Sequence, residues 1–433
     1  MQRERRATLA VLASAVALGV ATLAHYAVNR PGTFGIDYEV YHAAARAARR
    51  GADFYAVSPD GSHFQYLYPP VTVLVFLPST LAESWWPGFL ALTAMSLAAS
   101  AVAARELCRY VASLGSEVGR LDAALVFAFL AVSSHSMPSL AYGQVNHLLV
   151  AAFVVGIVRL AEDRDRDRDK DRGRDRDRDR NRDRQSRAGA LLAVPAFVKI
   201  FPGAVGLYLL RRRAWRAIAA AVGTAAGLTV AGLLAFGVDT YRTYVVDALL
   251  ARREVDAFAG GLSPTRAMVT LRRPLSVTFP TVDPTWYAVG AAVLLAPVLA
   301  VLYRRPDSRT DWHVALHATL VATLLWFPSL LVYYAYLTPT LVVCCYDLPP
   351  GRGRSLFVAG ALVANLSVSY RGVSEALRTL PVSGDFADFV RELLRPVLML
   401  GTPVLYGCLL MLAGCVVYRA EVEESESRPR RTE

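Results

Sequence analysis

The chain has 433 residues, 54% of them hydrophobic, and a mean hydropathy of +0.34. A soluble domain is on average less apolar than this, so an ordinary soluble protein is excluded. The formal net charge of +11 at pH 7 does not indicate nucleic-acid binding, because the basic residues stand mainly in short clusters at the ends of apolar segments. That distribution is typical of the cytoplasmic loops of membrane proteins.

Apolar segments recur along the whole chain, and several run to roughly 20 residues with almost no charge, enough to cross ~30 Å of hydrocarbon. We therefore expect an all-α, polytopic membrane helix bundle with about 12 spans, roughly 10–14. The first segment is too long for a signal-peptide core and lacks a clear cleavage site, so we expect it to be retained. The segments are 7–28, 69–82, 85–104, 121–141, 143–160, 188–210, 217–236, 285–303, 311–327, 330–346, 355–370 and 395–418.

The polar intervals divide the chain into modules. Basic residues at the start of the chain place the N-terminus in the cytoplasm, and the first loop then lies outside. Between the two halves, Arg and Asp alternate without an apolar face, which predicts a solvated linker. The predicted parts are an N-terminal membrane module at 1–160 with its first outer loop at 29–68, the linker at 161–187, a C-terminal membrane module at 188–418 and a charged cytoplasmic tail at 419–433.

The first outer loop carries the most informative residue, Asp37, which follows the first apolar segment directly. Residues 38–50 are rich in Ala and Arg and predict a short amphipathic helix on the membrane surface. Asp37 is then either only the N-cap of that helix or a functional carboxylate at the membrane edge. In the second case a polar substrate from outside and a lipid-borne substrate can both reach it. Tyr41 and Tyr68 are further candidates in this loop.

Two polar features interrupt the apolar segments further along. Gln144 and Asn146 lie between two apolar runs, where amides either hydrogen-bond a sugar or join helices to each other. Lys199 is a single lysine in an apolar segment, so it should face a cavity or an anion such as a phosphate unless it snorkels to the interface.

Two later stretches of the chain contain the remaining candidate site residues. Arg266 is one of five arginines in 252–273, a loop expected outside, where they indicate either an anionic ligand or an ordinary charged loop. Tyr334 belongs to the tyrosine-rich stretch 327–336, which fits an aromatic belt or a carbohydrate site equally well. The cysteines show no paired spacing, and no nucleotide-binding loop occurs. We expect no metal, no cofactor and no nucleotide-sugar donor.

Taken in order, these motifs resemble glycosyltransferase family 87 of the GT-C superfamily over roughly residues 30–340. The stretches that carry the resemblance are Asp37-Tyr38-Glu39-Val40-Tyr41, Gly51-Ala52-Asp53-Phe54-Tyr55, Tyr68-Pro69-Pro70, Gly143-Gln144-Val145-Asn146, Val198-Lys199-Ile200-Phe201-Pro202, the basic loop Arg211–Arg216, and Ser329–Tyr336. The chain departs from the family at Gly261–Arg266, where an Asn-Gln-Ser pattern is common, and at Tyr334, near which a histidine is frequent.

The resemblance implies a multi-pass protein of the cell membrane whose active site faces outside. Family members are similar to transferases that use polyprenyl-phosphate-mannose, so it implies a polyprenyl- or dolichyl-phosphate-linked sugar donor, with mannose as the sugar, and a glycan or lipid acceptor. Asp37 then looks like the catalytic base of an inverting, metal-independent transfer. The partners expected besides substrates are membrane lipids and not nucleic acid. A transporter or flippase for a lipid-linked or polar substrate is the alternative.

Overall fold

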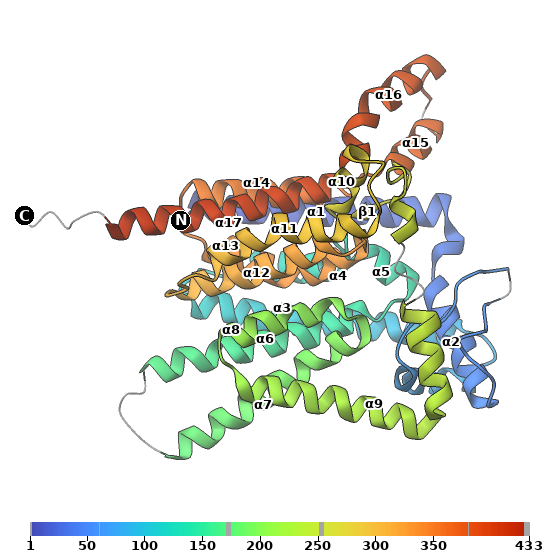
Figure 1. The fold of residues 1–433 in the computed structure, drawn as a ribbon, viewed down its shortest axis with the longest axis horizontal. Coiled ribbons are helices and arrows are strands. Elements are labelled where there is room, and N and C mark those ends of the chain that lie inside the picture. Colours follow the sequence, from blue (N-terminus) through green and yellow to red (C-terminus); the bar gives the residue numbers. More distant parts are fainter. Residues whose placement is uncertain (1, 60, 170–174, 251–254, 380, 428–433) are drawn as a thin grey trace, which may run out of the picture. The chain divides into compact units, whose positions relative to one another are not determined.

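The computed structural model describes residues 2–59, 61–169, 175–250, 255–379 and 381–427, and these residues are nearly all helical (Figure 1). They form two compact units. Unit 1 consists of Met1–Leu18, Ser133–His135 and Glu254–Glu433, and unit 2 consists of Gly19–Val132 and Ser136–Arg253.

Unit 2 is a bundle in which α3, α6, α7 and α9 pack side by side and α2 packs against η2. After the end of the first helix, its elements are η1 (Pro31–Thr33), α2 (Ile36–Arg49), η2 (Pro70–Leu81), α3 (Trp86–Ser113), α4 (Arg120–Val132), α5 (Met137–Tyr142), α6 (Asn146–Asp169), α7 (Asp175–Lys199), η3 (Phe201–Ala204), α8 (Val205–Arg211), α9 (Trp215–Thr243) and η4 (Tyr244–Leu250).

Unit 1 begins with the first part of α1 (Gln2–Asn29), includes the short stretch Ser133–His135 and is otherwise C-terminal. A two-stranded antiparallel sheet pairs Met268 with Leu330 and Val269 with Ser329. The elements are η5 (Val255–Phe258), β1 (Met268–Val269), α10 (Arg272–Thr278), α11 (Thr285–Leu302), α12 (Arg309–Trp326), β2 (Ser329–Leu330), η6 (Leu331–Tyr336), α13 (Thr338–Asp347), α14 (Arg352–Asn365), α15 (Tyr370–Thr379), α16 (Gly384–Leu400) and α17 (Pro403–Ser427).

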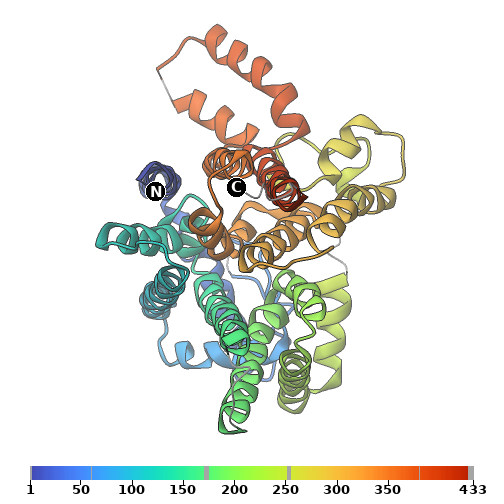
Figure 2. The ribbon, with the colours of Figure 1, turned by 90° about the vertical axis from the view of Figure 1, so that its left-hand side faces the viewer.

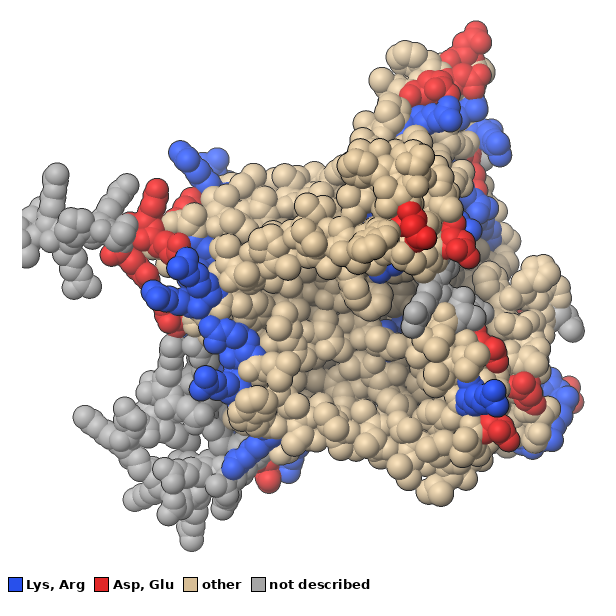
Figure 3. Space-filling model, viewed as in Figure 1, with Lys and Arg blue, Asp and Glu red and all other residues tan. Residues whose placement is uncertain are grey.

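Five helices in the described part of the chain are long and apolar enough to cross a membrane, or six if the bent pair α14 and α15 forms one span. They are α1, α3, the helical run that begins with α9, α11 and α17. In Figure 3 the charged side chains on the visible face gather at helix ends and leave the long sides of the helices uncharged. These features support a membrane protein.

The expected number of about 12 spans is not confirmed and stays a prediction. Several apolar segments form helices shorter than a span, such as α4 with 13 residues and α13 with 10. Another segment, η2, is a 3-10 helix with Pro78 in its interior, where proline has no N–H group to donate to the preceding turn.

Neighbouring helices extend into both of the predicted polar segments. Residues 170–174, within the Arg/Asp linker, lie outside the described residues, while α6 and α7 extend into the segment from either side. At the C-terminus, α17 runs through the first part of the predicted tail to Ser427. The module boundaries and the side of the membrane on which each loop lies stay predictions.

In unit 1, glycines bring α14 and α17 close together. A Cβ atom added at Gly360 would lie 2.6 Å from the carbonyl oxygen of Gly407, and one added at Gly414 would lie 2.7 Å from that of Gly353. Each helix therefore places two glycines seven residues apart on the contact face, so that the backbones touch. Small residues are typical of such contacts because they allow extensive packing between helices in a membrane.

We predict that Gly360→Val lowers the melting temperature, because the new side chain would collide with the α17 backbone. Overpacking of this kind typically costs about 1–3 kcal/mol. The matched control is Gly227→Val on α9, where nothing lies within 4 Å of an added Cβ. Thermal unfolding of both variants in detergent provides the measurement. Equal melting temperatures for the two variants would contradict the close contact.

Candidate active site

Asp37 lies in the first turn of α2, half-buried within unit 2. The helix begins at Ile36, and the residue before it is Gly35, whose N–H donates to the carbonyl of Ala141 at 2.8 Å. This bond joins the start of α2 to α5. Asp37 is therefore not the N-cap, and its carboxylate is directed to another element: Gln144 Nε2 donates to Asp37 Oδ2 at 2.5 Å.

A network of hydrogen bonds fixes the orientation of the Gln144 amide. Asn146 Nδ2 donates to Gln144 Oε1 at 2.6 Å and to Ser139 Oγ at 2.7 Å, and the Ser139 hydroxyl donates to the same Gln144 oxygen at 3.2 Å. Because the amide oxygen is used by these donors, the amide nitrogen must face Asp37. The predicted pair of amides is thus placed beside the predicted carboxylate. Ser139, which completes the network, carried no signal in the sequence.

The corner that presents Gln144 depends on Gly143. This residue ends α5 with a φ of 75°, in the left-handed region that glycine adopts readily. A Cβ atom there would lie 2.7 Å from the Cβ of Tyr38 on α2 and 2.9 Å from the ring of Phe89 on α3. The absence of a side chain therefore lets the corner between α5 and α6 approach the start of α2.

Lys199 is the last residue of α7, not the middle of a continuous span. Ile200 follows with a φ of 52°, and the chain turns into η3. The Lys199 ammonium lies 5.2 Å from the centroid of the Tyr68 ring, within the range of a cation–π contact. A lysine at a helix C-terminus also interacts favourably with the helix dipole.

Tyr41 and Tyr68 are joined by a hydrogen bond of 2.9 Å between their hydroxyls. Tyr55, which was not predicted as a site residue, donates to the carbonyl of Tyr68 at 2.7 Å and holds that segment in place. The tyrosines of the predicted first loop thus turn inward and form a buried aromatic cluster of unit 2. Helix α2 buries half of its residues, among them Tyr38 and Tyr41, while Arg46 and Arg49 stay exposed. Its predicted position on a membrane surface stays a prediction.

Opposing effects set the protonation of Asp37. Burial raises the pKa of its carboxyl, while the hydrogen bond from Gln144 and the positive charge of Lys199 lower it, and the net direction is upward. Burial likewise raises the pKa of the Tyr41 hydroxyl well above its ordinary value, so this group stays neutral. A carboxylate whose pKa is raised is better able to accept a proton.

Six of the eight predicted site residues belong to unit 2 and the other two, Arg266 and Tyr334, to unit 1. Arg266 is exposed on the loop before β1, and its carbonyl accepts a hydrogen bond from the buried guanidinium of Arg273. Tyr334 is fully buried, with its ring 4.1 Å from that of His135. Among the described residues, no three His, Cys, Asp or Glu side chains gather as metal ligands.

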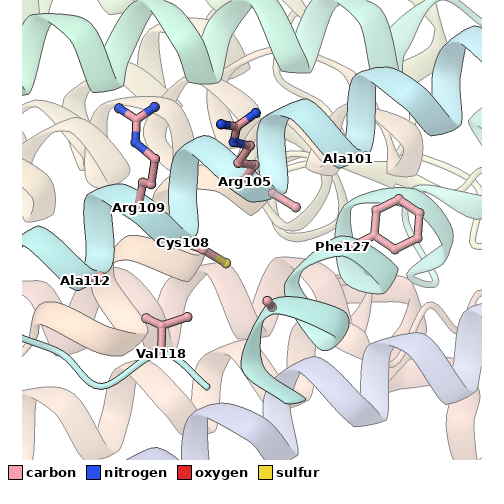
Figure 4. A pocket seen from close by; sticks show the side chains of 9 residues that line it. Ala101, Arg105, Cys108, Arg109, Ala112, Val118 and Phe127 are labelled. Atoms are coloured by element: carbon pink, nitrogen blue, oxygen red, sulfur yellow. The ribbon is translucent and has the colours of Figure 1, made fainter. Parts of the chain in front are cut away.

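A pocket of about 500 Å³ lies elsewhere in unit 2, between α3 and α4. Figure 4 shows Arg105, Cys108 and Arg109 on α3, opposite Val118 and Phe127. Phe89, which faces the Gly143 corner, is 16 residues before Arg105 on the same helix. At 1.5 Å per residue, Arg105 lies roughly 24 Å along α3 from Phe89, and Ala101, which also lines the pocket, roughly 18 Å, so the pocket belongs to a different region than the Asp37 network.

The family comparison defines the class of protein. The model of glycosyltransferase family 87 matches residues 66–333, more than half of the chain, and the chain belongs to this family, which is of the GT-C type. It is therefore a membrane glycosyltransferase. The matched range includes Tyr68, Gln144, Asn146, Lys199 and Arg266. No curated protein and no solved structure matches the chain.

We predict that Gly143→Ala destabilises the protein more than Gly51→Ala does. Both glycines have a φ of 70–75°, so alanine strains the backbone at each by roughly 1–2 kcal/mol. Only Gly143 is also crowded, since nothing lies within 4 Å of a Cβ at Gly51. Thermal unfolding of the two variants gives the comparison, and equal losses would show that the corner does not need its close contact with Tyr38.

Proposed function

We propose that the protein transfers a sugar, mannose, from a polyprenyl or dolichyl phosphate to a hydroxyl of a glycan or lipid acceptor at the outer face of the cell membrane. The observation that carries this proposal is the hydrogen-bonded carboxylate of Asp37 in the same unit as the half-buried Lys199. Membership of the family supports glycosyl transfer. A carboxylate and a cation supply the two functions that transfer from a phosphate donor requires.

Asp37 is the proposed base. The acceptor oxygen attacks the anomeric carbon, the bond from that carbon to the phosphate oxygen breaks, and the electron pair leaves with the phosphate. The proton of the acceptor hydroxyl moves to Asp37. Because the attack comes from the side opposite the departing phosphate, this single displacement inverts the anomeric centre. No step in this mechanism requires a metal ion.

Lys199 is the proposed group that stabilises the departing phosphate. An ammonium already held in place gains interaction energy as negative charge develops and requires no reorganisation at that moment. Its contact with Tyr68, which Tyr41 and Tyr55 fix in turn, keeps the amine in position. Arg266, on an exposed loop of unit 1, is kept as a second candidate for this role on the strength of the sequence alone.

The amides of Gln144 and Asn146 have a positioning role in this proposal. They are engaged with Asp37, Ser139 and each other, so they orient the base in preference to binding the sugar themselves. Fixing a catalytic group in its reactive geometry is one of the main contributions that a protein makes to rate.

The experiment is sugar transfer by the purified protein with polyprenyl-phosphate-mannose or GDP-mannose as donor, in wild type and in Asp37→Asn. We expect transfer from the lipid donor alone and a loss of at least about a hundredfold in the variant, the lower end of what general base catalysis contributes. Asp53→Asn in the same loop is the matched control, because that side chain only accepts a bond from the backbone of Tyr55.

Two results would overturn this proposal. Transfer from GDP-mannose alone would contradict the lipid donor. Normal turnover in Asp37→Asn, together with normal turnover in the Asp53→Asn control, would contradict the assignment of the base while leaving the donor class standing.

We predict that Gln144→Ala shifts the acid limb of the pH–rate profile to higher pH. Asp37 must be ionised to act as a base, so activity falls as pH drops through its raised pKa. The bond from Gln144 lowers that pKa, and its removal therefore raises it further. The profile of kcat against pH measures the shift. An acid limb that stays in place while KM rises would instead make Gln144 a substrate-binding residue.

A further inference from the structure

Helix α16 carries an exposed apolar stripe that neither the candidate active site nor the packing of unit 1 uses. At 3.6 residues per turn, Phe386, Phe389, Leu393, Val397 and Leu400 fall on one flank of the helix. Their exposure ranges from 42% for Leu400 to 62% for Phe389. The stripe extends over 14 residue steps, or roughly 21 Å along the helix.

The other two flanks of α16 have different surroundings. One flank packs inward through the buried residues Ala387 and Leu398. The third carries the charges, and these pair with one another: Arg391 with Asp388 at 2.9 Å and Arg395 with Glu392 at 3.5 Å. The apolar stripe therefore has the protein along one edge and a charged, solvated row along the other. This three-sided pattern is typical of a helix at a membrane surface.

The position of α16 in the chain ties it to the membrane. Only Gly401 and Thr402 separate it from α17, one of the candidate spans, and α15 before it belongs to the bent pair that can form another. Figures 1 and 2 show α15 and α16 side by side as a helical hairpin. A helix joined by so short a linker to a transmembrane span lies near the membrane–water interface.

Hydrogen bonds fasten the last turn of α16 to its neighbours in unit 1. The Tyr406 hydroxyl on α17 donates to the carbonyl of Val397 at 2.7 Å, and Arg273 Nη1 on α10 donates to the carbonyl of Leu398 at 3.3 Å. The helix thus leaves its adjoining span at a fixed angle, and the stripe cannot turn freely into the protein.

From this geometry we propose that α16 is an interfacial membrane helix whose stripe of Phe386, Phe389, Leu393, Val397 and Leu400 lies among the acyl chains of the lipid. Its paired charges face the headgroups and water. Membrane lipid is the occupant that fits, because it covers an apolar stripe and solvates a charged row along the same helix. A protein partner covering the stripe is the alternative that the test must exclude.

The test uses spin labels on the full chain in lipid nanodiscs, in a Cys108→Ser background, since the other four cysteines are buried. Labels are attached at Phe389→Cys and Leu393→Cys on the stripe, with Asp388→Cys and Glu392→Cys as matched controls one residue away. Collision rates are measured with oxygen, which enters hydrocarbon, and with a water-soluble nickel chelate. Thermal unfolding of each labelled variant confirms that the fold is kept.

We expect the oxygen-to-nickel ratio to be several-fold higher at positions 389 and 393 than at 388 and 392. Free access of the nickel chelate to all four positions would place the stripe in water and overturn the proposal. Low access of both agents at 389 and 393 would show that protein covers the stripe, a second copy of the chain included, and would overturn it as well. Both readouts are independent of sugar transfer.

Discussion

The hydrogen bond from Gln144 to Asp37 is the interaction on which the organisation of unit 2 around the candidate site depends. A carboxylate removed from water is costly unless donors and positive charge compensate for the lost hydration. Gln144 supplies the donor and Lys199 the charge, and together they offset part of the effect of burial on the Asp37 pKa. The site needs both burial and this compensation, because a general base must be ionised before the reaction and must also have a pKa high enough to accept a proton.

Close approaches of the backbone make that bond possible. Gly35 and Gly143 both adopt a positive φ, and a side chain at either would collide with its neighbours, Trp85 in the first case and Tyr38 in the second. The starts of α2 and α6 can therefore come together at one corner. Tyr41, Tyr55 and Tyr68 belong to the aromatic cluster behind them and are linked by hydrogen bonds, and the ammonium of Lys199 lies over the ring of Tyr68. Rigid, well-packed surroundings of this kind are what a positioned base and cation require.

The sequence was sufficient for the helical class, the membrane setting and the family, because long apolar segments and the ordered motifs are local signals. It also singled out Gln144, Asn146 and Lys199, since amides and a lone lysine stand out among apolar residues. The prolines at 195 and 202 left open from the sequence whether this helix is broken, and the structure ends α7 at Lys199, three residues before Pro202. Ser139 gave no signal, and Tyr55 stood out only as part of a motif stretch, because their roles arise from contacts between segments that are distant in the sequence. Helix α16 crosses residue 395, where the last apolar segment was predicted to begin. The apolar and charged residues of an amphipathic helix alternate, so its mean hydropathy is moderate and a search for apolar segments does not find its start.

The most direct test of this account is the titration of Asp37 itself, followed by infrared spectroscopy as the carbonyl band of its protonated carboxyl. The band is assigned by its absence from Asp37→Asn, so neither the donor nor the acceptor needs to be known. We expect a pKa above the ordinary aspartate value, and a further rise in both Gln144→Ala and Lys199→Met. A carboxyl that titrates at its ordinary pKa, unchanged in the two variants, would show that Asp37 is solvated and independent of the network, and would contradict the account.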